Sequence, residues 1–320
     1  MGGLMYSWRK YILAVVAVAT AAGFGNIKSS HRHIPADIRD AVADNRFDTS
    51  IPSFEKNDGK IPEPKAAAVK GINKGYVEPV EPATPIEYVA IPGGKFTMGT
   101  TSIEEGFEDA KPVPEVTIKT FQMAKTAVTV AQYSECVIKG GCTKPGTGEY
   151  CNWGKSGRQL HPVNCVEWDQ AQAYAKFKGA RLPSEAEFEY AATSGGRNQK
   201  YPWGNDEPTC DKAVMNGNGG YGCGTNSTMP VCSKPKGNTA QGLCDVSGNV
   251  WQWVQDKYQD SYKGAPIDGS AFEGAGSGRV IRGGSFLNVV AGYLRADNRS
   301  LNEHGSRNNH IGFRLVRSSR

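Results

Sequence analysis

Cysteine is the residue type in this sequence with the widest chemical range, and its eight copies lie within about one third of the chain. An even number of cysteines in an exported protein predicts about four disulfides rather than reactive thiols. Pairing between neighbours is one of several connectivities left open. No Cys-x-x-Cys pair or Cys/His cluster occurs, which disfavours a zinc site. The cysteines are Cys136, Cys142, Cys151, Cys165, Cys210, Cys223, Cys232 and Cys244.

The other reactive side chains form no recognisable catalytic pattern. The sequence holds no Gly-x-Ser-x-Gly elbow, phosphate-binding loop or zinc-protease helix motif. Asp297 and Glu303 are close enough in sequence to be considered as an acid/base pair, although acidic pairs at this spacing are common on loops. His161 precedes a proline, and we expect it to be a hydrogen-bonded structural residue rather than a ligand.

A C-terminal segment, residues 286–310, is unusually dense in Asn, Arg and His side chains. Hydrogen-bonding groups of this kind on a rigid scaffold are typical of a recognition surface. The alternative is a solvated polar loop network that only closes the fold. The polar residues are Asn288, Asn298, Asn302, His304, Arg307, Asn308, Asn309 and His310.

Composition restricts the class of protein. The chain has 320 residues, is 38% hydrophobic and contains 39 Gly and 18 Pro, which indicates a globular protein with many turns and excludes a coiled coil. The net charge is +5, with Lys and Arg scattered along the sequence. A nucleic-acid-binding domain usually clusters its basic residues, so we expect no nucleic-acid partner.

The N-terminal region predicts export. Arg9 and Lys10 precede an apolar run over 11–24 that is short for a membrane span, and small residues follow the Ala-x-Ala pattern of a cleavage site. We expect residues 1–25 to be a signal peptide or, alternatively, an uncleaved anchor, which would be the only membrane attachment. Residues 26–86 are polar and Pro-rich, as in a flexible linker. A periplasmic, cell-surface or secreted location follows.

The elements that must position these residues begin near residue 87. Residues 88–99 predict two short strands around a turn at Gly93-Gly94, and residues 116–121 alternate as one half-buried strand would. Capping-box patterns predict three helix starts, at Thr129, Asn164 and Ser184.

Several motifs in residues 87–317 together resemble the formylglycine-generating enzyme (sulfatase-modifying factor) family. The resemblance implies an α+β, C-type-lectin-like fold with much irregular structure. In order, the motifs are Ile-Pro-Gly-Gly-x-Phe-x-Met-Gly at 91–99, His-Pro-Val at 161–163, Arg-Leu-Pro-Ser-Glu-x-Glu at 181–187, Tyr-Pro-Trp-Gly-Asn at 201–205, Gly-Asn-Val-Trp-Gln-Trp at 248–253, Arg-Gly-Gly-Ser-Phe at 282–286 and Ile-Gly-Phe-Arg at 311–314.

The catalytic cysteines of this family have no counterpart here. Formylglycine-generating members bind copper(I) through two cysteines after the Gly-Gly-Ser stretch, since soft thiolates suit that ion. Asn288 stands at the first position, the second falls near Tyr293, and the last cysteine of the chain is Cys244. A related branch uses a three-histidine iron site, but no His-x-x-x-His-x-Glu helix occurs. We therefore expect neither copper nor either known reaction.

Family members also carry structural calcium at the Gly-Asn-x-Trp-Glu-Trp loop. The matching ligands here would be Asp245, the Gly248 and Val250 carbonyls, and Gln252. Gln252 replaces the usual Glu, which lowers the ligand charge and weakens the attraction for a hard cation. The loop could hold calcium or could be closed by the Gln amide alone.

The resemblance suggests that the C-terminal segment lines a ligand cleft. The leading hypothesis is an exported, disulfide-stabilised pseudoenzyme that binds a peptide, glycan or protein there. One rival is an oxidoreductase or protein-modifying enzyme acting through other residues, and another is a structural accessory of an envelope complex. The expected ligand-binding residues are Phe286, Asn288, Tyr293, Asn302, His304, Arg307 and His310.

Overall fold

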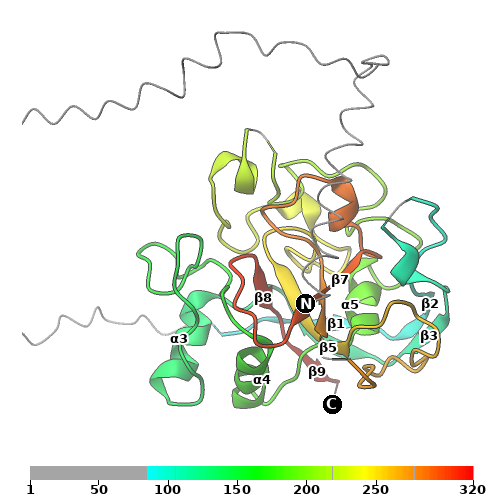
Figure 1. Cartoon of the computed structure of the whole chain (residues 1–320), viewed down its shortest axis with the longest axis horizontal. Helices are drawn as coiled ribbons and strands as arrows, with labels where there is room; N and C mark the ends of the chain where they lie inside the picture. Colours follow the sequence, from blue (N-terminus) through cyan, green and yellow to red (C-terminus); the bar gives the residue numbers. More distant parts are fainter. Residues whose placement is uncertain (1–84, 105, 218, 277, 320) are drawn as a thin grey trace, which may run out of the picture. The chain divides into compact units, whose positions relative to one another are not determined.

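The computed structural model describes residues 85–319 apart from 105, 218 and 277. The expected signal or anchor (1–25) and nearly all of the expected linker therefore lie outside the described residues. The α+β prediction is confirmed, because the described residues form three short α-helices, nine strands and long irregular segments, whose arrangement Figure 1 shows. The α-helices are α3 (Val130–Ile138), α4 (Trp168–Phe177) and α5 (Glu185–Ala192); four 3-10 turns are Glu108–Ala110, Tyr221–Gly224, Pro235–Gly237 and Ala291–Leu294.

The strands form three sheets. One sheet has the order β1-β4-β9, a second pairs β2 with β3, and the third has the order β7-β6-β5-β8, in which β5 and β8 are parallel. All other neighbours are antiparallel. The strands are β1 (Tyr88–Ile91), β2 (Gly94–Thr97), β3 (Glu115–Ile118), β4 (Phe121–Ala124), β5 (Trp251–Lys257), β6 (Gly278–Arg282), β7 (Arg299–Glu303), β8 (Ile311–Phe313) and β9 (Val316–Ser318).

The expected hairpin at Gly93-Gly94 is wrong. Tyr88 lies opposite Ala124, and six residues further along each strand Gly94 lies opposite Ile118. Residues 88–97 therefore run antiparallel to 115–124 in one constant register that is interrupted in the middle. Gly93 is needed there because a Cβ would lie 2.4 Å from the Ile118 carbonyl oxygen. The same interruption divides the strand expected at 116–121 into β3 and β4.

Two of the three expected helix starts are confirmed. Thr129 and Ser184 each form a full capping box with the residue three positions on, Gln132 and Glu187. The start at Asn164 is wrong, because α4 begins at Trp168 with Glu167 as its N-cap. The Asn164 side chain is instead used in tertiary contacts, accepting from the Asn152 backbone N–H at 2.7 Å and donating to two backbone carbonyls.

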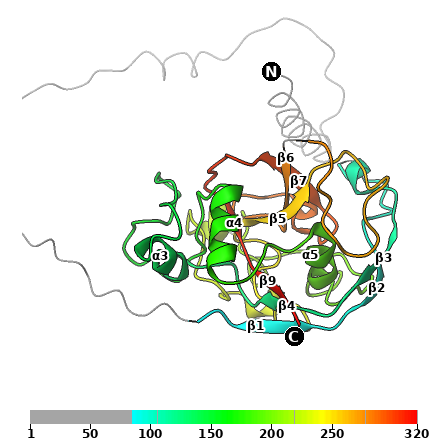
Figure 2. The same cartoon turned by 90° about the horizontal axis from the view of Figure 1, so that it is seen from below.

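Helix α5 lies in the middle of the domain. Figures 1 and 2 place α3 and α4 on one side of β5 and the β2–β3 pair on the other. All eight residues of α5 are buried, and Phe188 packs among apolar side chains of several strands. Leu182, just before the helix, is fully buried, and Arg181 forms an ion pair with Glu187 at 2.6 Å.

Among residues 85–319, no helix is long and apolar enough to cross a membrane.

Candidate functional site

Asn288, which the resemblance places at the first copper-binding position, is a buried structural residue. Its Oδ1 accepts from the backbone N–H of Ser285 at 2.8 Å and from the Ser285 hydroxyl at 3.1 Å. Its backbone carbonyl accepts from Asn216 at 2.9 Å. Tyr293 packs edge-on against Trp251, with ring centroids 6.4 Å apart. These groups hold a loop together and offer no thiolate to copper(I).

All eight cysteines are disulfide-bonded to their neighbours in sequence, so the described chain holds no free thiol. Neighbour pairing, one of the connectivities that the sequence left open, is the one observed, and its first pair is Cys136–Cys142. Cys244 is the last cysteine of the sequence, so the segment that follows the Gly-Gly-Ser stretch carries no thiol. The remaining pairs are Cys151–Cys165, Cys210–Cys223 and Cys232–Cys244.

The C-terminal ligand-binding candidates fall into two groups. Phe286 is fully buried and, with Asn288 and Tyr293, lies in the packed interior or at its edge. Asn302, in β7, is half-buried, and its side-chain oxygen accepts from the Glu303 backbone N–H. The other three candidates follow β7 and are described next.

His304 and Arg307 lie against the start of α4. His304 Nδ1 is 3.3 Å from Asp169, and Arg307 donates twice to the Glu167 carboxylate, at 3.0 Å each. His310 is half-buried beside Asn309, and burial lowers its pKa to about 4. Asp297 is ion-paired with Arg295 at 2.6 Å, and no contact between Asp297 and Glu303 occurs among the described residues.

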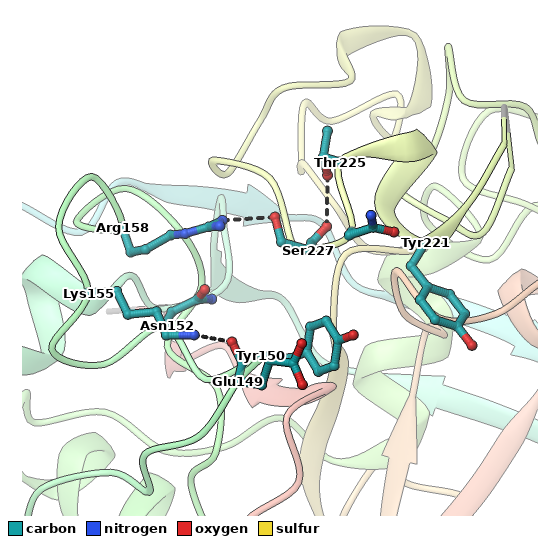
Figure 3. A pocket seen from close by; sticks show the side chains of 9 residues that line it. Glu149, Tyr150, Asn152, Lys155, Arg158, Tyr221, Thr225 and Ser227 are labelled. Carbon is teal, nitrogen blue, oxygen red and sulfur yellow. Dashed lines mark hydrogen bonds between the residues drawn. The ribbon is translucent and has the colours of Figure 1, made fainter. Parts of the chain in front are cut away.

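A polar pocket of about 370 Å³ opens close to Phe286. Tyr150 links the two, because its ring lies 6.3 Å from the Phe286 ring, and the Gly222 backbone N–H donates to the Phe286 carbonyl. Figure 3 shows Lys155 and Arg158 entering from one side and Tyr221 from the other. The lining residues are Glu149, Tyr150, Asn152, Lys155, Arg158, Tyr221, Thr225, Asn226 and Ser227.

Two disulfide-closed loops form the walls of the pocket. The Cys151–Cys165 bridge closes the loop that carries Arg158, and the Cys210–Cys223 bridge ends in the turn that carries Tyr221. That turn is tightly wound: Gly222 has φ +59° and a Cβ there would lie 1.9 Å from the Ser227 carbonyl oxygen. Only glycine fits at this position, because a side chain would collide with the Ser227 backbone.

Arg158 and His161 join the two walls. Arg158 Nη1 donates to the Ser227 hydroxyl at 2.9 Å and lies 3.1 Å from His161 Nδ1, which is 2.9 Å from the Thr228 hydroxyl. Burial, and secondly the Arg158 charge, lowers the pKa of His161 to about 4. His161 is therefore neutral at physiological pH, in agreement with its expected structural role.

The loop matched to the family's calcium site is closed by a guanidinium. Arg314, fully buried, donates from Nε to Gln252 Oε1 at 2.5 Å and from Nη2 to the Asp245 carbonyl at 3.0 Å. Gln252 Nε2 donates to the same Asp245 carbonyl at 2.9 Å, and Asp245 Oδ2 accepts from the Cys232 N–H. Both polar atoms of Gln252 are occupied, so this side chain does not fit a calcium ligand as folded.

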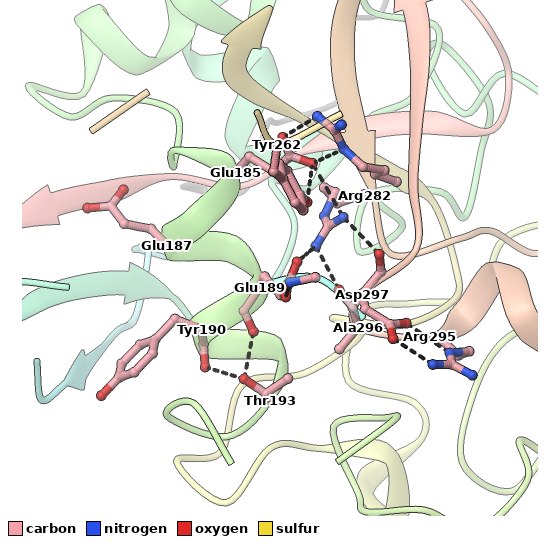
Figure 4. A network of polar contacts seen from close by, with 12 residues as sticks. Glu185, Glu187, Glu189, Tyr190, Thr193, Tyr262, Arg282, Arg295, Ala296 and Asp297 are labelled. Carbon is pink, nitrogen blue, oxygen red and sulfur yellow. Dashed lines mark hydrogen bonds and ion pairs between the residues drawn. The ribbon is translucent and has the colours of Figure 1, made fainter. Parts of the chain in front are cut away.

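No group of three or more His, Cys, Asp or Glu side chains in the described ranges is arranged to hold a metal ion. The largest charge cluster instead joins α5 to β6 and β7. Arg299 pairs with Glu185 at 2.7 Å, and Arg282 pairs with Glu189 and lies 3.4 Å from Glu185 (Figure 4). Burial raises the pKa of Glu189 to about 7. These pairs are enclosed by the core and fasten the scaffold.

The sequence alone did not point to the pocket. Tyr150 and Tyr221 each lie one or two residues before a cysteine, Cys151 and Cys223, and Arg158 lies inside a cysteine-bounded loop. Aromatic residues beside disulfide cysteines were the available signal. It could not be used without knowing that the two loops face each other.

The model of the sulfatase-modifying factor enzyme 1-like domain matches residues 74–319, and the chain belongs to this family. A formylglycine-generating enzyme from Streptomyces coelicolor is 30% identical over 315 residues, covering 80% of this chain and 95% of that one. The inactive C-alpha-formylglycine-generating enzyme 2 of Bos taurus is 28% identical over 279 residues, covering 72% of this chain and 88% of that one.

The fold agrees with this assignment. The structure of PvdO from Pseudomonas aeruginosa superimposes with a TM-score of 0.64 and 30% identity over 75% of this chain and 99% of that one. The expected formylglycine-generating-enzyme-like, C-type-lectin-like fold is thus confirmed. The chain spans 38% to 60% of the length of several other curated relatives. Since relatives include both an active and an inactive enzyme by name, membership alone fixes neither role.

Proposed function

We propose that this chain is an exported, non-catalytic member of the family that binds a peptide, glycan or protein ligand in the polar pocket beside Phe286. One observation carries the proposal. Where the family places its first copper-binding cysteine, the Asn288 amide is buried and bonded to Ser285, while a ligand-sized pocket stands open close by. The site therefore has a pocket that can bind a ligand but lacks the thiolates that the family's oxidation requires.

Three further features support binding as the function. The pocket walls are each fixed by a disulfide, so little ordering entropy is lost when a ligand enters. The two walls come from separate loops, which is how binding residues are usually presented on a rigid scaffold. Four disulfides also favour an oxidising compartment, in line with export.

Binding and turnover can be tested on the same preparation. The oxidised full chain is screened on peptide and glycan arrays, together with Tyr221→Ala in the pocket and Arg317→Gln on β9 as a control outside it. We expect selective binding that Tyr221→Ala weakens at least tenfold and Arg317→Gln leaves unchanged. In parallel, a cysteine-containing peptide is incubated with the protein, copper(I) and oxygen.

Conversion of that cysteine to formylglycine would overturn the proposal that the protein is non-catalytic and would favour the alternative hypothesis of an oxidoreductase or protein-modifying enzyme. If Tyr221→Ala leaves the affinity unchanged, the ligand binds outside the pocket, for example on a surface used in an envelope complex. An unchanged peptide together with pocket-dependent binding is the expected result.

A further inference from the structure

The pocket holds more positive charge than its own lining neutralises. Arg158 contacts three neutral groups, the His161 ring, the Ser227 hydroxyl and the Thr228 carbonyl, and all three contacts use Nη1. No carboxylate of the described chain pairs with it. Its Nε and Nη2 donate to no group within the described part of the chain.

Lys155 and Glu149 do not cancel the charge of Arg158. Lys155 Nζ donates to the backbone carbonyl of Glu149, and the two side chains contribute one charge of each sign to the lining. With Arg158, the pocket carries a formal excess of one positive charge. Arginine is the side chain best suited to bind a carboxylate in a partly enclosed site. Two N–H groups of its guanidinium can donate in parallel to the two carboxylate oxygens.

The rest of the lining suits hydroxyl groups rather than an apolar side chain. None of the nine residues is Leu, Ile, Val, Met or Phe. The Asn226 amide and the hydroxyls of Tyr150 and Tyr221 have no hydrogen-bond partner within the described part of the chain. The two tyrosines add flat apolar ring faces with polar tips, a combination that packs well on a ligand with both C–H and O–H groups.

From this arrangement we propose that the pocket binds an acidic sugar residue of a glycan, with its carboxylate on Arg158 and its hydroxyls among Tyr150, Tyr221 and Asn226. The inference rests on the proposed binding function and narrows its ligand class. A volume of about 370 Å³ admits one or two sugar rings. A peptide with an acidic side chain is the competing occupant, but it carries fewer hydroxyl groups for Tyr150, Tyr221 and Asn226 to bind.

Titration calorimetry on the full chain tests the proposal with paired probes. Oligosaccharides that contain galacturonate, glucuronate or N-acetylneuraminate are each compared with a counterpart whose carboxyl group is methyl-esterified. We expect at least one acidic probe to bind tenfold or more tighter than its ester. Arg158→Gln should remove this preference, and Arg317→Gln, the same substitution outside the pocket, should preserve it.

Folding is checked separately because Arg158 also holds the pocket wall. Tyr221→Ala removes only a partly exposed ring and should lower affinity for acidic and neutral probes alike, while Arg158→Lys should retain part of the acid preference. Equal affinity for acid and ester, or an acid preference that survives Arg158→Gln, would overturn the inference. Failure of every saccharide, combined with Tyr221-dependent binding on the peptide array, would overturn it too and leave the proposed binding function standing.

Discussion

His161 shows how the surroundings of one residue decide its chemistry. Because its pKa is about 4 in the folded chain and 6.5 is its ordinary value, the unfolded chain binds more protons between these pH values. Its contribution to stability is therefore complete above pH 6.5 and is lost as the pH falls toward 4. We expect the stability advantage of the wild type over His161→Gln to shrink by about 2 kcal/mol between pH 7 and pH 4.5. Urea unfolding at a series of pH values measures it.

The comparison with the variant matters because other groups titrate in the opposite sense. Burial raises the pKa of Asp256 to about 8, and that of Glu189 to about 7, so both favour the folded state as the pH falls. These contributions are common to both proteins and cancel in the difference. A difference that stays constant from pH 7 to pH 4.5 would contradict the assignment, and NMR titration of the His161 ring would confirm it independently.

At the scale of elements, the pocket wall around Tyr221 depends on its disulfide. Cys210 and Cys223 are 13 residues apart, and closing a loop of that length stabilises a protein by about 3 kcal/mol in the chain-entropy model. We expect the double variant Cys210→Ser/Cys223→Ser to lose stability and to exchange amide hydrogens faster over residues 219–228. Hydrogen-exchange mass spectrometry resolves this segment.

Removing the bridge between Cys136 and Cys142 provides the matched control. It closes a shorter loop, of 6 residues, at the end of α3 and does not line the pocket. Its loss should leave hydrogen exchange at 219–228 unchanged. Equal loosening of that segment in both double variants would mean that the pocket wall is not held by its own disulfide.

The loop that resembles a calcium site leads to a prediction about metal dependence. Arg314 already supplies the positive charge beside Gln252 and the Asp245 carbonyl. We therefore expect the melting temperature to be the same with millimolar calcium and with a chelator. Differential scanning calorimetry checks this, and a saturable rise in melting temperature with calcium would show that the loop rearranges to admit the ion.

Elements whose cause is local were predictable from the sequence. The caps at Thr129 and Ser184 each depend on residues three positions apart, whereas the disulfide connectivity, which spans 6 to 14 residues, was left open. The Gly93-Gly94 segment was wrongly predicted as a hairpin because its partner strands lie over twenty residues away in the sequence. Gly93 is required there by the close approach of the Ile118 carbonyl oxygen. Asn164 was misread because its amide is satisfied by distant backbone rather than by a helix.

For the candidate site, the sequence predicted the missing cysteines but not the position or lining of the pocket. The replacement of the first cysteine by Asn288 could be read directly, since it needs only the order of the motifs. The pocket could not, because Arg158 and Ser227 are 69 residues apart and meet through two irregular loops whose courses no local pattern sets. The exposure of Phe286 was also predicted wrongly. It was expected at a ligand-binding surface, but its side chain is fully buried and its ring lies 6.3 Å from that of Tyr150.

At the scale of the whole molecule, buried ion pairs join α5 to β6 and β7. The chain continues from β6 to Phe286, which lies close to the pocket. Arg282 ends β6, and Glu189, its partner on α5, also accepts from the Gly99 N–H at 2.6 Å. Gly283 and Gly284, the next two residues, turn the chain toward Phe286 in left-handed conformations. The position of the C-terminal segment thus depends on a pair of charges enclosed by the core.

Removing one charge of this pair should cost far more than removing both. In Arg282→Met the Glu189 carboxylate remains buried without its counter-charge, and we expect a loss of about 3–5 kcal/mol. The double variant Arg282→Met/Glu189→Gln keeps an acceptor for Gly99 and carries no buried charge at either position, so it should recover at least half of that loss. Urea unfolding of the three proteins at pH 8 gives the comparison.

The pH dependence separates lost charge pairing from lost packing. Without Arg282 the pKa of Glu189 rises further, and a raised carboxyl pKa costs stability as the pH increases above the unfolded value of 4.5. The deficit of Arg282→Met should therefore grow from pH 5 to pH 8, while that of the double variant should stay level. Equal deficits at both pH values, with no recovery in the double variant, would mean that Arg282 acts mainly by filling space between α5 and the sheet.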